Sequence, residues 1–487
     1  VYGKTLPALP GLLRFGTWVG GDMDGNPNVG ADTLRATLQA QQAQVLGSYR
    51  SDLSHLQSLL SQSIGRIGVD PRVLMRIDDY RGRLGDEATG LIKARHEDMP
   101  YRVLIGLMQM RLDATSRQSA HGYRDTHELL DDLQLIAHSL QTQRGEHAGL
   151  FALRRVMRRV ETFGFHLATL DQRQDSRVHD AALASLLQVT DWASRSREER
   201  AATLTACLQS LLQLPPREQL DASTLQCLQT FEALAALSKQ YSTAALGPYI
   251  VSMSRSAADA LAVLVLARMA GHVDRTGSIP MDVVPLFETV DDLDSAATVV
   301  DALLQDAAYR AHLKRRGDRQ MVMLGYSDSA KDAGLAASRW AIQRAQIALT
   351  ALASEHGIRI AFFHGRGGSA SRGGSKTERA IIAAPRGSVD GYLRLTEQGE
   401  VIHRRYGIRA LALRNLEQAT GAVLRATARP RPPEPREAGW RTIMGRIAET
   451  SRCVYRALVH EDAGFVGYFR AATPIDVIER LKLGSRP

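Results

Sequence analysis

The stretch MVMLGYSDSAK (residues 321–331) shows the pattern that decides the fold. Its apolar first part predicts a buried strand, and its polar second part predicts the loop that follows. Further apolar runs centre near positions 285, 361 and 394, so the spacings are about 38, 38 and 33 residues. Each spacing fits one strand-helix-strand unit of roughly thirty residues or more. The sequence therefore predicts successive parallel strands.

Seven strands are expected in all. They are predicted at 12–18, 165–170, 249–253, 282–287, 321–326, 358–363 and 392–395. Parallel strands joined by helices can form an open sheet or a closed barrel, and the spacing fits both. We expect a mainly helical region at 1–160, the strands at 161–425 with a helical insertion at 175–247, and a proline-rich loop with final helices at 426–487.

The composition is that of a globular protein. The 487 residues are 44% hydrophobic and 23% charged, which excludes a disordered or fibrous chain. The net charge of +9 comes from dispersed arginines, which argues against a nucleic-acid surface. Three widely spaced cysteines predict a reducing, cytoplasmic location, and no apolar run is long enough to span a membrane. The first fifteen residues resemble neither a signal peptide nor a natural start, so we expect an internal piece of a longer chain.

Polar side chains follow the predicted strands, where parallel folds gather their active sites. Glu288 and Asp328 end consecutive strands, and two converging carboxylates suit Mg²⁺ or Mn²⁺. The alternative is a structural ion network in which they pair with Arg173 and Lys331.

A glycine-rich segment, FHGRGGSASRGG (residues 363–374), follows another predicted strand. Glycines let backbone N–H groups converge on an anion, and Arg366 and Arg372 can bind phosphate or carboxylate oxygens. The spacing is not that of a P-loop. With His364 and the carboxylates, this segment suggests an enzyme that acts on a small phosphorylated acid.

Five motifs, in this order, resemble phosphoenolpyruvate carboxylase, over practically the whole chain. They are FGTWVGGDMDGNPNV (15–29), LDQRQ (170–174), VPLFE (284–288), LGYSDSAKDAG (324–334) and FHGRGG (363–368). The resemblance implies a predominantly helical α/β protein around a TIM-like barrel with large helical insertions. Seven predicted strands are one short of that barrel, so we expect an incomplete barrel here. It also implies a cytoplasmic homotetramer that binds phosphoenolpyruvate and bicarbonate and forms oxaloacetate and phosphate, through carboxyphosphate, the enolate of pyruvate and CO₂.

The resemblance also implies roles for particular residues. Glu288 and Asp328 would be the metal ligands. His364, Arg372 and Lys331 would be catalytic. The substrate-binding residues would be Arg173, Arg366, Arg486, Gly367 and Gly368.

The sequence departs from the family pattern at several points. Met23 stands where most members have Arg, and Ser371 and Ser375 stand where they have Gly. The 487 residues contain neither the T-A-H-P-T segment with its catalytic His nor the tail beyond GSRP (484–487), so we expect slow turnover. The alternative is a catalytically silent module that binds phosphoenolpyruvate or another anion. A different barrel enzyme of phosphoenolpyruvate chemistry, such as an aldolase or mutase, fits the two longest motifs poorly.

Overall fold

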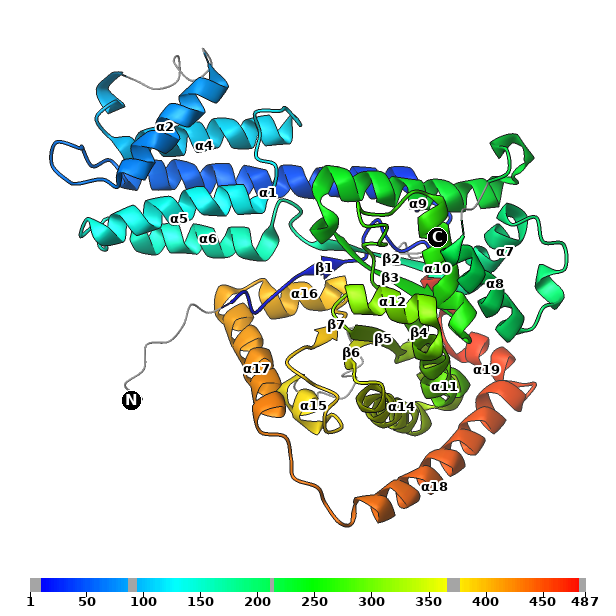
Figure 1. The fold of residues 1–487 in the computed structure, drawn as a ribbon. Helices are drawn as coiled ribbons and strands as arrows, with labels where there is room; N and C mark the ends of the chain where they lie inside the picture. Colours follow the sequence, from blue (N-terminus) through cyan, green and yellow to red (C-terminus); the bar gives the residue numbers. More distant parts are fainter. Residues whose placement is uncertain (1–9, 86–93, 211–213, 366–376, 481–487) are drawn as a thin grey trace. The chain divides into compact units, whose positions relative to one another are not determined.

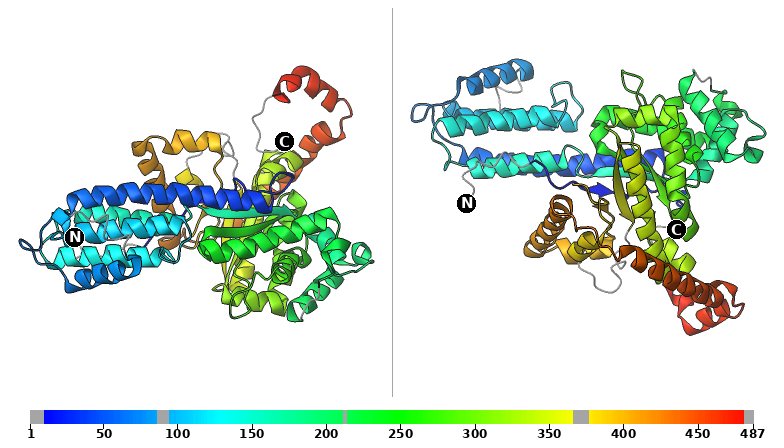
Figure 2. Two further views of the ribbon diagram at one scale, coloured as in Figure 1. Left: turned by 90° about the horizontal axis from the view of Figure 1, so that it is seen from above. Right: turned by 60° about the horizontal axis from the view of Figure 1, so that its bottom comes forward.

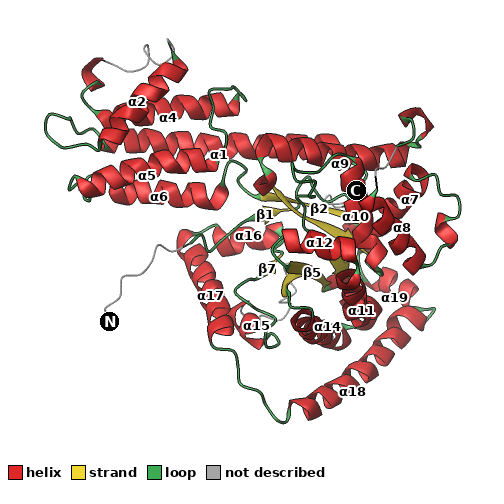
Figure 3. Cartoon of the chain, viewed as in Figure 1, coloured by secondary structure: helices red, strands yellow, loops and turns green. Residues whose placement is uncertain are grey.

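The computed structural model describes residues 10–85, 94–210, 214–365 and 377–480 (Figure 1). Helices predominate among them, and the strands are few and short (Figure 3). The chain divides into two compact units. The helical unit comprises Val1–Gly21, Asp32–Asp171 and Ala236–Gly247, and the barrel unit comprises Asp22–Ala31, Gln172–Ala235 and Pro248–Pro487.

The helical unit is built on one long helix with shorter helices beside it (Figures 1 and 2). Those in the described ranges are α1 (Ala31–Leu59), α2 (Pro71–Leu84), α4 (Pro100–Ser116), α5 (Thr126–Thr142) and α6 (Leu150–Phe163). Leucines and tyrosines recur at helical spacing, so each helix buries one apolar stripe in a shared core. Asp70 accepts a hydrogen bond from the backbone N–H of Arg72 and thereby caps the start of α2.

A fully buried carboxylate, Asp132, lies inside this helical core. The hydroxyl groups of Tyr80 and Tyr123 each donate to it at 2.7 Å, and Arg76 forms an ion pair with it. Arg111 lies 4.7 Å from the Tyr80 ring centre and 4.1 Å from that of Tyr123, and it donates to the Tyr80 hydroxyl. Burial raises the pKa of Asp132 although these donors and cations oppose the shift. The cluster ties α2, α4 and α5 together by polar contacts.

The described strands form one sheet in the order β1 to β7, curled into part of a barrel, as the resemblance to a known family predicts. All the recorded strand pairs are parallel. The strands are β1 (Gly16–Thr17), β2 (Thr169–Asp175), β3 (Leu246–Ser252), β4 (Val283–Phe287), β5 (Arg319–Gly325), β6 (Arg359–Gly365) and β7 (Arg394–Leu395).

The remaining helices connect these strands or follow the last one. They are α7 (Ser176–Leu186), α8 (Arg197–Gln209), α9 (Ala222–Tyr241), α10 (Ala257–Met269), α11 (Val290–Gln305), α12 (Ala307–Arg315), α13 (Ser327–Ala333), α14 (Leu335–Glu355), α15 (Thr377–Ala383), α16 (Gly399–Tyr406), α17 (Arg409–Ala428), α18 (Glu437–Arg456), α19 (Phe465–Ala472) and α20 (Ile475–Ile478). Thr289 forms a capping box with Asp292 at the start of α11. Within the described ranges, no helix combines the length and apolar character that a membrane crossing requires.

The predicted position of one strand was wrong. The apolar run at 165–170 predicted it, but β2 begins at Thr169 and continues through the polar residues to Asp175. Leu167 has a φ of 62°, which ends any extended strand there. The polar residues can form the strand because Gln172 is buried and Arg173 is paired with a carboxylate. Arg173 therefore lies within the strand and not in a loop after it.

The two faces of the sheet have different environments in the barrel unit. Phe287, Leu324 and Phe362 belong to one core with residues of α11 and α14, so their face lies against these helices. Successive side chains along a strand alternate between faces. Met323 and Phe363 are therefore on the opposite face, toward the barrel interior.

A buried histidine makes the stability of the barrel unit depend on pH. His179 is fully buried, and one ring nitrogen lies 2.8 Å from the Tyr249 hydroxyl. Burial lowers its pKa to about 4, against a weaker opposing effect of Asp175. Folding then favours neutral His179, and stability is lost as the pH falls from about 6.5 to about 4. Across that interval this residue should remove about 3 kcal/mol from the free energy of unfolding.

Urea unfolding at several pH values measures this effect. His179→Phe should show a smaller loss of stability on acidification than the parent, because Phe cannot take up a proton. Exposed His127 provides the matched control, and His127→Phe should retain the parent's pH dependence. Equal pH dependence in His179→Phe and the parent would contradict the assignment.

Candidate active site

Arg173 is held by an aspartate of the segment that follows β1. Its Nε and Nη2 donate to the two carboxylate oxygens of Asp22, both at 2.8 Å, and Nη2 lies 3.5 Å from Asp24. The Met23 N–H donates to the Arg173 carbonyl at 2.9 Å, so the backbone also fixes this segment beside β2. Burial opposes the charge on Arg173, but Asp22, Asp24 and Glu288 raise its pKa and keep it a cation.

Glu288 follows β4 and is buried, with an exposed fraction of 9%. It comes one residue after Phe287, so alternation places it toward the barrel interior. Its carboxylate accepts a hydrogen bond from the Met253 N–H at 3.2 Å. Met253 has a φ of 55°, a strained value for a residue with a side chain, at the end of β3.

The end of β5 approaches Glu288 so closely that only glycine fits. A Cβ on Gly325 would lie 2.9 Å from the Glu288 Cα and 3.0 Å from the Phe287 carbonyl oxygen. A larger residue would push β5 away from β4 beside Glu288, one of the two candidate metal ligands. Gly325 therefore sets the separation between these strand ends.

Asp328 lies in the first turn of α13, just after β5. Lys331 on the same helix donates to it at 3.1 Å, and both side chains are exposed. Burial raises the pKa of Glu288 to about 7, and the negative charge of Asp328 adds to this shift, while Arg173 opposes it. The Asp328 carboxylate is thus close enough to disfavour the charged form of Glu288, a repulsion that a cation would relieve.

This arrangement fits a hard divalent cation with incomplete protein ligation. Among the described residues, no group of three or more His, Cys, Asp or Glu side chains is placed to hold a metal ion. Glu288 and Asp328 would supply two oxygen ligands, and substrate or water oxygens would supply the others, as is common for Mg²⁺. The alternative ion network predicted from the sequence is present only in part. Asp328 forms an ion pair with Lys331, whereas Arg173 forms its ion pair with Asp22.

His364 lies on the other face of the sheet from Glu288. It pairs in register with Leu324 on β5 and Leu395 on β7, and Leu324 belongs to the core beneath the helices. Its Nδ1 lies 2.8 Å from the hydroxyl group of buried Tyr326. The structure therefore does not bring His364 into the cluster of Arg173 and Glu288.

Several predicted site residues lie outside the described part of the chain. They are Arg366, Gly367, Gly368, Arg372 and Arg486, together with the departures Ser371 and Ser375. Met23, the remaining departure, is buried.

Sequence reasoning assigned no role to Asp22 and Asp24, although they surround Arg173. Asp24 also accepts a hydrogen bond from the Ser252 hydroxyl at 3.1 Å, at the end of β3. The available signal was the pair of aspartates within GGDMDGNPN (20–28), because glycine-rich acidic segments beside strand ends are frequent ligand sites.

Comparisons with known proteins identify the family. A sequence model described as phosphoenolpyruvate carboxylase matches residues 1–487. The chain belongs to the phosphoenolpyruvate carboxylase family. It is 57% identical over 488 residues to the phosphoenolpyruvate carboxylase of Xanthomonas oryzae pv. oryzae, an alignment that covers 100% of this chain and 53% of the relative. It is 38% identical over 502 residues to that of Gloeobacter violaceus, which covers 98% of this chain and 53% of the relative.

The resemblance read from the five motifs is therefore confirmed over the full sequence. The chain spans about half the length of the curated phosphoenolpyruvate carboxylases that it matches. The motifs that carry Arg173, Glu288 and Asp328 belong to this matched half.

Proposed function

We propose that the barrel unit binds phosphoenolpyruvate together with Mg²⁺ or Mn²⁺ and serves the carboxylation of phosphoenolpyruvate by bicarbonate to oxaloacetate and phosphate. The observation that carries this proposal is the Glu288 carboxylate, buried at a strand end and electrostatically coupled to both Asp328 and Arg173. Two hard oxygen ligands beside a buried guanidinium suit a cation and a phosphorylated anion bound side by side. Family membership and the names of the relatives support the same reaction.

Each charged residue has a proposed task. Glu288 and Asp328 hold the cation, and the cation would offset negative charge that develops on the substrate oxygens. Arg173, with Arg366, Arg486 and the backbone of Gly367 and Gly368, binds the phosphate and carboxylate groups. For Arg173, this requires the substrate anion to compete with Asp22, its partner at 2.8 Å.

The other proposed catalytic residues are Lys331, Arg372 and His364. Lys331 pairs with Asp328, so it can adjust the charge of that carboxylate. To take part in the reaction, His364 would have to contact the substrate around the edge of the sheet, because its ring is hydrogen-bonded to Tyr326 on the opposite face from Glu288. A cytoplasmic location and a homo-oligomeric assembly stay predictions.

A second candidate function is a silent anion-binding module. The observation that favours it is the position of His364, a predicted catalytic residue, on the opposite face of the sheet from Glu288. Metal-dependent binding of phosphoenolpyruvate fits both functions, whereas formation of oxaloacetate fits only the carboxylase.

Coupling oxaloacetate to malate dehydrogenase and following NADH absorbance separates the two functions. The resemblance assigns proton handling to a His in a T-A-H-P-T segment that these 487 residues do not contain. Loss of such a group typically slows turnover by about a hundredfold to ten-thousandfold. We therefore expect measurable but slow turnover relative to a carboxylase of the relatives' length.

Calorimetry with phosphoenolpyruvate, in the presence and absence of Mn²⁺, completes this test. Binding that requires Mn²⁺, together with slow turnover, would support the carboxylase. Binding without any turnover would favour the silent module, and turnover equal to the longer enzyme would overturn the expectation of impairment. Failure to bind phosphoenolpyruvate with Mn²⁺ would overturn the proposed function itself.

A further inference from the structure

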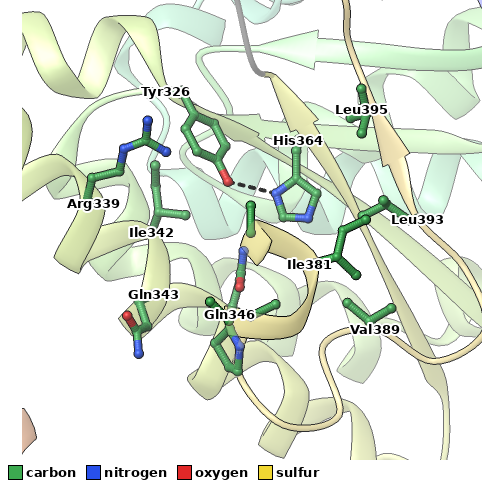
Figure 4. Close-up of a pocket in the computed structure, with 14 residues that line it drawn as sticks. Tyr326, Arg339, Ile342, Gln343, Gln346, His364, Ile381, Val389, Leu393 and Leu395 are labelled. Atoms are coloured by element: carbon green, nitrogen blue, oxygen red, sulfur yellow. Dashed lines mark hydrogen bonds between the residues drawn. The ribbon is translucent and has the colours of Figure 1, made fainter. Parts of the chain in front are cut away.

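The start of α13, the helix that carries Asp328, is anchored by the residue before it. Tyr326 directly precedes α13, and its hydroxyl group lies 2.8 Å from Nδ1 of His364 on β6 (Figure 4). Both side chains are buried, and they belong to the barrel unit together with the whole of α13. The first turn of the helix, with Asp328, is therefore tied to the sheet.

The end of α13 lies against α18, which comes from the C-terminal part of the barrel unit. A Cβ on Gly334, the residue after α13, would lie only 3.0 Å from the Tyr455 ring. The next residue of α18, Arg456, donates through Nη1 to the Asp332 carboxylate at 2.9 Å and to the Asp332 carbonyl oxygen at 3.3 Å. Ala448 buries α18 in the core that it shares with α11 and α14. The contacts of α18 therefore hold the end of α13 in place.

Asp332 also contacts the segment that follows Glu288. Its second carboxylate oxygen accepts a hydrogen bond from the Val290 N–H at 3.2 Å. Val290 is buried and is the first residue of α11, where backbone N–H groups have no acceptor within the helix. Only Thr289 separates Val290 from Glu288. Asp332 thus supplies the acceptor that the start of α11 needs, and it joins this segment to α13.

We propose that Asp332 and Arg456 are positioning residues for the candidate metal site. Together they set the separation between Glu288 and Asp328, the two proposed ligands. Asp332 lies one helical turn after Asp328 on α13 and is bonded to the backbone two residues after Glu288. Each of its carboxylate oxygens already accepts a hydrogen bond, which gives Asp332 a positioning role and not a place among the ligands. The inference rests on the proposed function, because it concerns the same site.

Asp332→Ala should lower the affinity for Mn²⁺ in the presence of phosphoenolpyruvate by about tenfold to a hundredfold, the usual effect of losing a group that orients metal ligands. The change removes the acceptor of the Val290 N–H and the partner of Arg456. Arg456→Gln should lower the affinity by about tenfold. Arg456→Lys should recover most of it, because both contacts of Arg456 use one nitrogen, which an ammonium group can replace. Calorimetric titration of the full 487-residue chain measures all three variants.

Two further variants separate positioning from a general loss of stability. If Arg456 acts through Asp332, the double variant Asp332→Ala/Arg456→Gln should bind Mn²⁺ as weakly as Asp332→Ala alone. Independent damage at the two residues would instead add up. Arg344→Gln is the matched control, because Arg344 on α14 pairs with Asp294 on α11 and its loss leaves the Asp332 contacts intact. This variant should keep the parent's affinity.

Hydrogen-exchange mass spectrometry adds a measurement that needs no metal. In Asp332→Ala, the peptide that contains Val290 should exchange faster than in the parent, because the Val290 N–H loses its acceptor. Arg344→Gln should exchange at the parent's rate in this peptide. If Asp332→Ala does not fold, Arg456→Gln decides through its Mn²⁺ affinity, since it changes the more exposed partner of the ion pair.

Four outcomes would overturn the inference. They are unchanged Mn²⁺ affinity in both single variants, an equal loss of affinity in Arg344→Gln, additive losses in the double variant, and unchanged exchange at Val290 in Asp332→Ala. Weak binding in Asp332→Ala and Arg456→Gln, with binding near the parent's in Arg456→Lys and Arg344→Gln, would support it. A parent that binds no Mn²⁺ with phosphoenolpyruvate would overturn the proposed function as well. A parent that binds Mn²⁺ no more tightly than the variants would overturn this inference alone.

Discussion

Replacing Glu288 with Gln should lower the affinity for Mn²⁺ in the presence of phosphoenolpyruvate by at least about a hundredfold, the upper end of losses seen when supporting groups of metal sites are changed. The substitution keeps the size of the side chain and removes its charge. Asp328→Asn should have a similar effect, because Asp328 follows the end of β5 and its charge acts on the Glu288 carboxylate at the end of β4. Calorimetric titration with Mn²⁺ measures both variants.

The matched control for these variants is Asp291→Asn. Asp291 lies in the first turn of α11, three residues after Glu288, and its exposed side chain pairs with Arg452. Its replacement should leave Mn²⁺ affinity unchanged. Unchanged affinity in both Glu288→Gln and Asp328→Asn would place the cation elsewhere.

Binding of Mn²⁺ should also depend on pH through Glu288. Burial, with the charge of Asp328, raises the pKa of this carboxyl to about 7, and a metal ligand must be deprotonated. Below about pH 7 the proton competes with the cation, so the apparent affinity should fall about tenfold per pH unit. Titrations at about pH 8 and about pH 6 check this slope, and the residual binding of Glu288→Gln should lack it. A parent affinity that is flat over this interval would exclude Glu288 as the titrating ligand.

Replacing Asp132 with Ala should be the most damaging single change in the helical unit. The change leaves the hydroxyl groups of Tyr80 and Tyr123 without their acceptor and Arg76 without its buried partner. Breaking a buried ion pair by removing one partner typically costs about 3–5 kcal/mol. Urea unfolding followed by circular dichroism measures this loss of stability. Asp132→Asn should lose less stability, because the amide oxygen of Asn can still accept a hydrogen bond from a tyrosine hydroxyl group.

Asp131 provides the control on the same helix, since it is exposed. Asp131→Ala should change the free energy of unfolding by less than about 0.5 kcal/mol, as is usual for surface substitutions. Equal effects of the two alanine variants would show that the buried cluster contributes no more than a surface residue.

The incomplete barrel was predicted only through the resemblance to the family, because the strand spacing fits an open sheet as well. The sequence by itself predicted the seven parallel strands and the helical first part of the chain. It could do so because buried parallel strands are continuous apolar runs, as in MVMLG (321–325), and such runs recur at the spacing of one strand-helix-strand unit. The same rule misplaced β2, whose residues are polar and buried through specific partners such as Asp22. Hydrophobicity carries no signal for a strand of that kind.

The candidate site likewise has features that the sequence predicted and features that it did not. Glu288 and Asp328 were predictable because each follows a clear apolar run, and parallel strands end on one side of a sheet. The pairing of Arg173 with Asp22, and the Met253 N–H aimed at Glu288, were not predictable, because these residues lie far apart in the chain. Only the tertiary structure decided on which face of the sheet each side chain lies. Alternation turns adjacent residues to opposite sides, so a shift of one position separates His364 from the site that its motif suggested.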